Sequence, residues 1–179
     1  LGWTPPQAPG ELEIGADAAF VALREELMFM QQLGRHAEAL RRLVGELLPR
    51  AGSFGDDDQL IGETWLIISR SRLELGDVEG ALVALGEEAL PRLERAGDLR
   101  LQLDARLGLV DVLTRRGDHD AAMRLITERI LPSAARLNAP HVEALAQVQR
   151  VELLAALGKP EEALRALHDA TPPLVERLG

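Results

Sequence analysis

A recurring glycine constrains this chain more than any other feature. Gly34, Gly76, Gly117 and Gly158 lie 42, 41 and 41 residues apart. With each of these glycines counted as position 0, five further positions match across the four copies. They are alanine at +5 (Ala39, Ala81, Ala122, Ala163), large apolar residues at +6 (Leu40, Leu82, Met123, Leu164) and +9 (Leu43, Leu85, Ile126, Leu167), proline at +15 (Pro49, Pro91, Pro132, Pro173), and glycine or asparagine at +21 (Gly55, Gly97, Asn138, Gly179). A fixed period of this length is the signature of a repeat protein.

Each copy has the pattern of two consecutive helices, A and B. Glycine at position 0 and glycine or asparagine at +21 suit the left-handed residue that ends a helix. Asp77 and Asp118 are favourable N-cap residues, and Pro160 suits a first helical position. The alanine at +5 predicts a close approach of two helices. We therefore predict A helices at 17–33, 57–75, 98–116 and 139–157, and B helices at 35–54, 77–96, 118–137 and 159–178.

These helices define the expected fold, an all-α chain of four helix hairpins. Connections of two or three residues make the two helices of a pair antiparallel. A single pair cannot bury its apolar face, whereas stacked pairs can, and this favours an α-solenoid. The predicted repeats are approximately 17–55, 56–97, 98–138 and 139–179. Residues 1–16 lack helical periodicity, and we expect a Pro-rich linker or arm there.

The proline at +15 falls inside helix B, where it removes one backbone hydrogen bond and collides with a carbonyl. Helix B either ends at this proline or continues through it with a kink. Strong helix formers follow Pro91 and Pro132, and a good terminating residue follows them, so we favour continuation.

Composition excludes several classes of function. The chain of 179 residues has no Cys, a net charge of −9, 3% aromatic residues and 46% hydrophobic residues. The lack of Cys excludes disulfides, thiolate metal sites and a thiol nucleophile. The acidic balance argues against nucleic acid and anionic membranes as partners. No stretch has the roughly 20 apolar residues of a membrane span, and no signal peptide is evident, so we expect a cytoplasmic protein. We also expect its source to be bacterial.

Glycine followed by alanine five residues later, within paired helices, resembles the tetratricopeptide repeat (TPR). Trp65, eleven residues before Gly76, matches an aromatic position typical of that family, although the other repeats have Leu23, Arg106 and Gln147 there. The period exceeds the family's usual value of about 34. It is similar to long-helix variants in kinesin light chains, LGN-type adaptors and MalT-like regulators. The resemblance implies a right-handed superhelix whose A helices line a concave groove.

The resemblance also implies a function, binding of a protein or peptide in that groove without catalysis. The matching groove positions are Arg24, Met28, Gln31, Glu63, Leu66, Arg70, Asp104, Leu107, Asp111, Arg115, Val148 and Glu152. An alternative is the ligand- or peptide-sensing arm of a larger bacterial regulator. We expect no cofactor, no metal and no catalytic residue. The last repeat could contact a second copy or continue into more of the parent chain.

Other candidate sites are weaker. His36 and His119 share position +2 but lie two repeats apart, too far to hold one ion at about 10 Å per helix layer. The run Asp56-Asp57-Asp58 lacks the alternating ligands of a calcium loop, and an acidic helix N-terminus explains it better. Trp3 could contact the groove or a neighbouring molecule.

Overall fold

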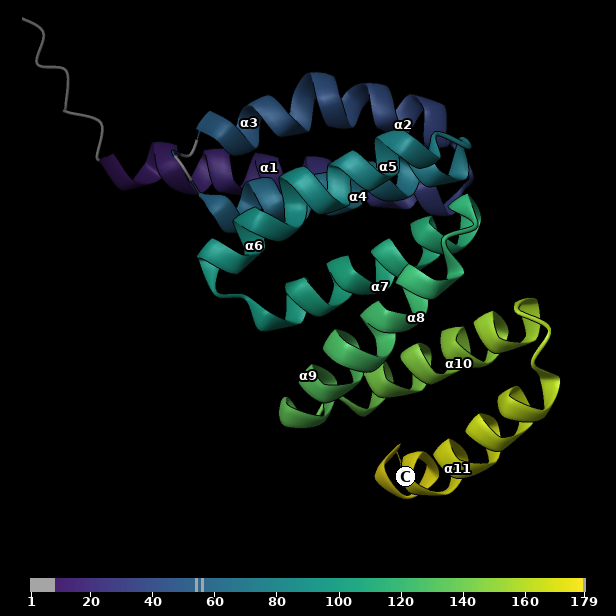
Figure 1. Ribbon diagram of the computed structural model, residues 1–179. Coiled ribbons are helices and arrows are strands. Elements are labelled where there is room, and N and C mark those ends of the chain that lie inside the picture. The colour runs from purple at the N-terminus through teal and green to yellow at the C-terminus, as the bar shows by residue number, and fades with distance from the viewer. Residues whose placement is uncertain (1–8, 54, 56, 179) are drawn as a thin grey trace, which may run out of the picture.

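The computed structural model describes residues 9–53, 55 and 57–178, and their side chains from 18 to 169 with the same gaps. The described residues are helical with short connections and contain no β-strand, as expected for an all-α fold. The four A helices are α1 (Pro9–Gln32), α4 (Asp58–Glu74), α7 (Leu99–Arg116) and α10 (Pro140–Ala156). Each is followed by a B helix, and the successive pairs lie in order from one end of the molecule to the other (Figure 1).

The first three B helices are continuous but contain a π-helical turn. They consist of α2 (His36–Arg42), η1 (Leu43–Leu47) and α3 (Leu48–Ser53), of α5 (Val78–Val83), η2 (Ala84–Ala89) and α6 (Leu90–Ala96), and of α8 (His119–Leu125), η3 (Ile126–Ile130) and α9 (Leu131–Arg136). The fourth is a single element, α11 (Pro160–Leu178). Apart from α1, every helix begins and ends within one residue of its predicted bounds.

The repeated glycines end helices as predicted. Gly34, Gly76, Gly117 and Gly158 have φ between 72° and 90°, the left-handed region that glycine enters without steric cost. Asn138, at position +21, has φ 49°. Asp77 caps α5 by accepting a hydrogen bond from the Gly80 N–H, but Asp118 makes no such bond. The prediction of a side-chain cap at Asp118 is wrong, because its carboxylate pairs with Arg116 instead.

The N-terminal boundary differs from the expectation. Helix α1 begins at Pro9, so residues 9–16 belong to a helix rather than to the predicted arm. Proline is tolerated in a first helical turn, where its missing N–H would have no intrahelical partner. Residues 1–8, and with them Trp3, lie outside the described part of the chain.

The prolines at +15 lie within continuous helices, in agreement with the favoured interpretation. Pro49, Pro91 and Pro132 each follow a π turn by two residues. The N–H of the residue before each proline bonds to the carbonyl five residues earlier, on Leu43, Leu85 and Ile126 respectively. Because this turn is wider than an α turn, the carbonyl four residues before the proline has room beside the ring.

The buried positions of the B helices explain why the wider turn is present. Positions +5, +9, +13 and +17 form one line of side chains that are at most 2% exposed: Ala39, Leu43, Leu47 and Ala51, then Ala81, Leu85, Ala89 and Leu93, then Ala122, Ile126, Ile130 and Ala134. The line spans 12 residues, whereas three α turns take up only about 11. One extra residue in a π turn keeps all four side chains on the same face.

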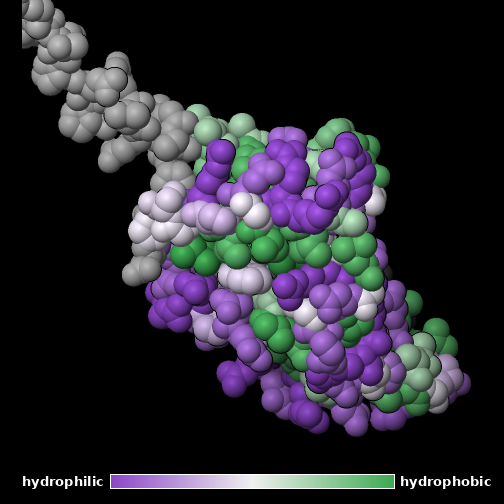
Figure 2. Space-filling view, turned by 90° about the horizontal axis from the view of Figure 1, so that it is seen from above, coloured by the Kyte–Doolittle hydropathy of each residue, from purple (hydrophilic) through white to green (hydrophobic). Residues whose placement is uncertain are grey.

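The hydrophobic core forms in layers, each containing a B helix and the A helices on both sides of it. Leu85 and Leu93 of the second B helix share a buried cluster with Leu73 of α4 and with Leu109 and Val112 of α7. The third B helix likewise packs between α7 and α10. The helices α4, α7 and α10 are therefore each held by their own B helix and by the preceding one. Seen from above, the molecule shows a hydrophobic band bordered by hydrophilic side chains (Figure 2).

Candidate functional site

The surface of interest lies along the A helices, at positions −13, −10 and −6 of each repeat. We call these twelve residues the A-helix surface. They are Val21, Arg24 and Met28, then Glu63, Leu66 and Arg70, then Asp104, Leu107 and Asp111, then Leu145, Val148 and Glu152. All twelve are at least partly exposed, although A-helix residues at neighbouring positions are buried. Ten of them belong to the set expected from the sequence.

Hydrogen bonds between successive A helices join this surface into one. Arg24 Nη1 of α1 donates to Glu63 Oε2 of α4 at 3.0 Å. Gln149 Nε2 of α10 donates to Asp111 Oδ1 of α7 at 2.6 Å. These bonds link neighbouring repeats, so Arg24, Glu63 and Asp111 have a structural role in addition to any contact with a partner.

Two other residues expected in the groove hold repeats together. Arg115 of α7 donates to the Leu73 carbonyl at 3.1 Å and to Glu74 Oε1 at 2.9 Å, both on α4. Gln31 is only 6% exposed. Its Nε2 donates to Ser71 Oγ and to the Ile67 carbonyl, each at 2.7 Å. The expectation that Gln31 faces a partner is therefore wrong, because its amide is buried between α1 and α4.

The fourth repeat exposes apolar side chains on this surface. Leu145 and Val148 are 57% and 51% exposed, whereas Leu66 and Leu107 at position −10 are half-buried and pack against core clusters. At position −13, the fourth repeat has Leu145 where the second and third repeats have Glu63 and Asp104. Exposed apolar side chains beside charged ones are typical of interaction sites.

Carboxylates also lie on this surface. Partial burial raises the pKa of Asp104, while Arg100 and Arg70 lower it and Asp98 raises it. Partial burial also raises the pKa of Asp111, against the effect of the hydrogen bond from Gln149. Raised carboxyl pKa values mean that both anions are stabilised less well here than in water. A cation brought to this surface would stabilise them.

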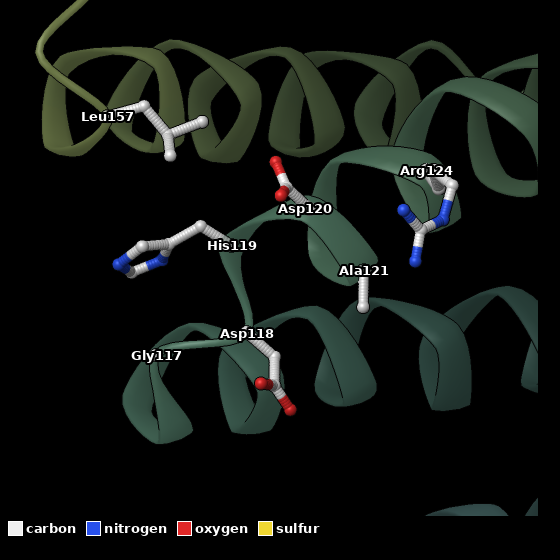
Figure 3. A pocket seen from close by; sticks show the side chains of 7 residues that line it. All are labelled: Gly117, Asp118, His119, Asp120, Ala121, Arg124 and Leu157. Atoms are coloured by element: carbon white, nitrogen blue, oxygen red, sulfur yellow. The ribbon is translucent and has the colours of Figure 1, made fainter.

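A hollow of about 420 Å³ lies away from the A-helix surface, at the turn between α7 and α8. His119 and Asp120 line it from the start of α8, and Leu157 lines it from the end of α10 (Figure 3). Asp120 points toward the helix that carries Leu157, whereas Asp118 points the opposite way. The acidic groups therefore do not converge on one point, as binding of a metal ion would require.

The remaining polar residues considered as metal ligands either have structural roles or lie too far from one another to bind one ion. Asp57 caps α4, because its Oδ1 accepts hydrogen bonds from the N–H groups of Gln59 and Leu60. This confirms the interpretation of an acidic helix N-terminus at that residue. Within the described residues, no group of three or more His, Asp or Glu side chains is placed to hold a metal ion.

No described helix has the length and hydrophobicity needed to cross a lipid bilayer. No protein-family model matches the chain, and no curated protein sequence matches it either. The TPR resemblance therefore depends on the chain's own repeated positions.

Proposed function

We propose that this protein binds a peptide segment of a partner protein across the A-helix surface and performs no catalysis. The observation that carries this proposal is the exposed pair Leu145 and Val148 on the same surface as Asp104, Asp111 and Glu152. Four bonded A helices offer a long surface on which an extended or helical segment could make contacts to several repeats. The proposed architecture is a right-handed α-solenoid of TPR type, which the glycine and alanine positions and the layered core support.

Apolar contact would supply most of the binding free energy. Leu145 and Val148 are half or more exposed, so covering them removes apolar surface from water, worth about 25 cal/mol per Å². The charged residues would fix the register of the bound segment, because a misplaced like charge costs affinity. The exposed carboxylates of Asp104, Asp111 and Glu152 favour a partner with a basic residue near an apolar one.

The proposal can be tested with a random-sequence peptide library displayed on phage. Peptides selected on the wild-type chain are measured by isothermal titration against Leu145→Glu. We expect at least about a tenfold loss of affinity, equivalent to 1.4 kcal/mol, because a carboxylate would replace an apolar contact. Val83→Glu is the matched control, since Val83 is 40% exposed on a B helix.

Two results would contradict this function. One is a selection that yields no binding peptide. The other is equal affinity of the wild-type chain and Leu145→Glu when circular dichroism shows that the variant is folded. A comparable loss with Val83→Glu would place the binding site on the B helices instead.

A further inference from the structure

The first A helix presents a face that is covered in every other repeat. At position −5, Ser71, Val112 and Leu153 are at most 1% exposed, whereas Phe29 is 59% exposed. At position −12 the counterparts of Ala22 are Thr64, Ala105 and Ala146. These three are also at most 1% exposed, whereas Ala22 is exposed. We call Ala22 and Phe29 the leading face.

In the later repeats these positions pack against the preceding repeat. Val112 of α7 shares a cluster with Ala81 and Leu85 of the second B helix. Leu153 of α10 shares one with Ile126 and Ile130 of the third. The surface that fits positions −12 and −5 is therefore the far side of another repeat of the same kind.

The fourth repeat presents the other half of that interface. Leu164 at position +6 is 63% exposed, whereas Leu40, Leu82 and Met123 are half-buried and pack against the clusters that involve the next A helix. Ala155 at position −3 is exposed, whereas Gln31 and Leu73 at the same position are buried. We call Ala155 and Leu164 the trailing face.

We propose that copies of this chain associate head to tail, with the leading face of one copy on the trailing face of the next. The new interface would continue the repeat-to-repeat packing already present within the chain. Position −3 of one repeat meets position −5 of the next, as the hydrogen bond from Gln31 to Ser71 shows. Between two copies, the small Ala155 would face the large Phe29, so the two faces complement each other in size.

The head-to-tail arrangement has a distinctive consequence. Each copy uses two different surfaces, so association does not stop at a dimer unless the rotation closes a ring. The mass measured by light scattering should therefore rise steadily with protein concentration. This behaviour separates the proposal from a symmetric dimer, in which two leading faces would meet and the mass would reach a plateau at twice that of one chain.

Two variants make the test decisive. Phe29→Glu blocks the leading face, and Leu164→Glu blocks the trailing face. Both side chains are largely exposed, so neither substitution disturbs the core. Each variant alone should remain a monomer, and an equimolar mixture should form a one-to-one heterodimer through the two intact faces. Val83→Glu should associate like the wild type.

Three outcomes would overturn the proposal. The first is a wild-type chain that stays monomeric over about a hundredfold range of concentration. That result would mean that the leading face is bare or is covered by something other than a second copy. The second is a mixture of the two variants that forms no heterodimer. The third is dimerisation of Leu164→Glu alone, which would indicate contact between two leading faces.

Discussion

The buried amide of Gln31 provides a direct test of how the first two repeats are joined. Gln31 and Gln32 are adjacent in α1, yet Gln31 is 6% exposed and Gln32 is exposed. Gln31→Ala removes both inter-repeat hydrogen bonds made by its Nε2. Gln32→Ala makes the same chemical change on the solvent side. Comparing the two variants therefore cancels the effect of the difference in helix propensity between Gln and Ala.

The expected loss for Gln31→Ala follows from what the side chain contacts. Each of the two hydrogen bonds contributes about 0.5–1.5 kcal/mol. Truncation also removes one buried CH₂ group, worth about 0.8 kcal/mol. We therefore expect the free energy of unfolding to fall by about 2–3 kcal/mol, and by less than about 0.5 kcal/mol for Gln32→Ala.

Urea unfolding followed by circular dichroism measures this difference. A loss of 2–3 kcal/mol should also lower Tm by about 5–10 °C in a chain of this size. Equal stability of the two variants would refute the reasoning, because it would mean that the amide of Gln31 does not join the repeats.

Three further substitutions test other parts of the structure. Gly62→Ala should lower the free energy of unfolding by about 1 kcal/mol, because overpacking outweighs the gain in helix propensity. The Cβ of the new alanine would lie 2.8 Å from Leu93 Cδ2. A variant that is more stable than the wild type in urea would contradict this expectation. Pro91→Ala should change the free energy of unfolding by less than about 1 kcal/mol, because the π turn already accommodates the proline. A gain in stability near about 3 kcal/mol would instead indicate that Pro91 strains an ordinary α-helix. The hydrogen bond from Arg95 lowers the pKa of the Asp58 carboxyl. The ionised carboxylate of Asp58 therefore stabilises the fold at neutral pH, and this contribution is lost as the pH falls below 3.8. The Tm difference between wild type and Asp58→Asn should therefore shrink in acid, and a difference independent of pH would argue against the ion pair.

The helix pairs could be predicted from the sequence because their ends have strong local causes. Glycine at position 0 adopts positive φ in all four repeats, and alanine at +5 is at most 6% exposed in each. The π turn was not predicted, although its signal is present. A buried line at +5, +9, +13 and +17 repeats every four residues rather than every 3.6. The extra residue in the helix can be inferred only once all four positions are known to be buried.

The candidate surface could be predicted only in part. Positions −13, −10 and −6 are exposed or half-buried in all four repeats. Gln31 was assigned to the same groove, but its amide is buried and bonds to α4 instead. A single sequence shows that a residue is polar, and it does not show whether solvent or a neighbouring repeat satisfies that polarity.

Amide hydrogen exchange on the complex with a library-selected peptide tests the central claim most directly. Binding across the A-helix surface should slow exchange in α4, α7 and α10, with the strongest effect around Leu145 and Val148. The B-helix segments α5–α6 and α8–α9 should exchange as in the free protein. Protection confined to those B helices, or to the hollow beside His119, would contradict the account and place the binding site elsewhere on the molecule.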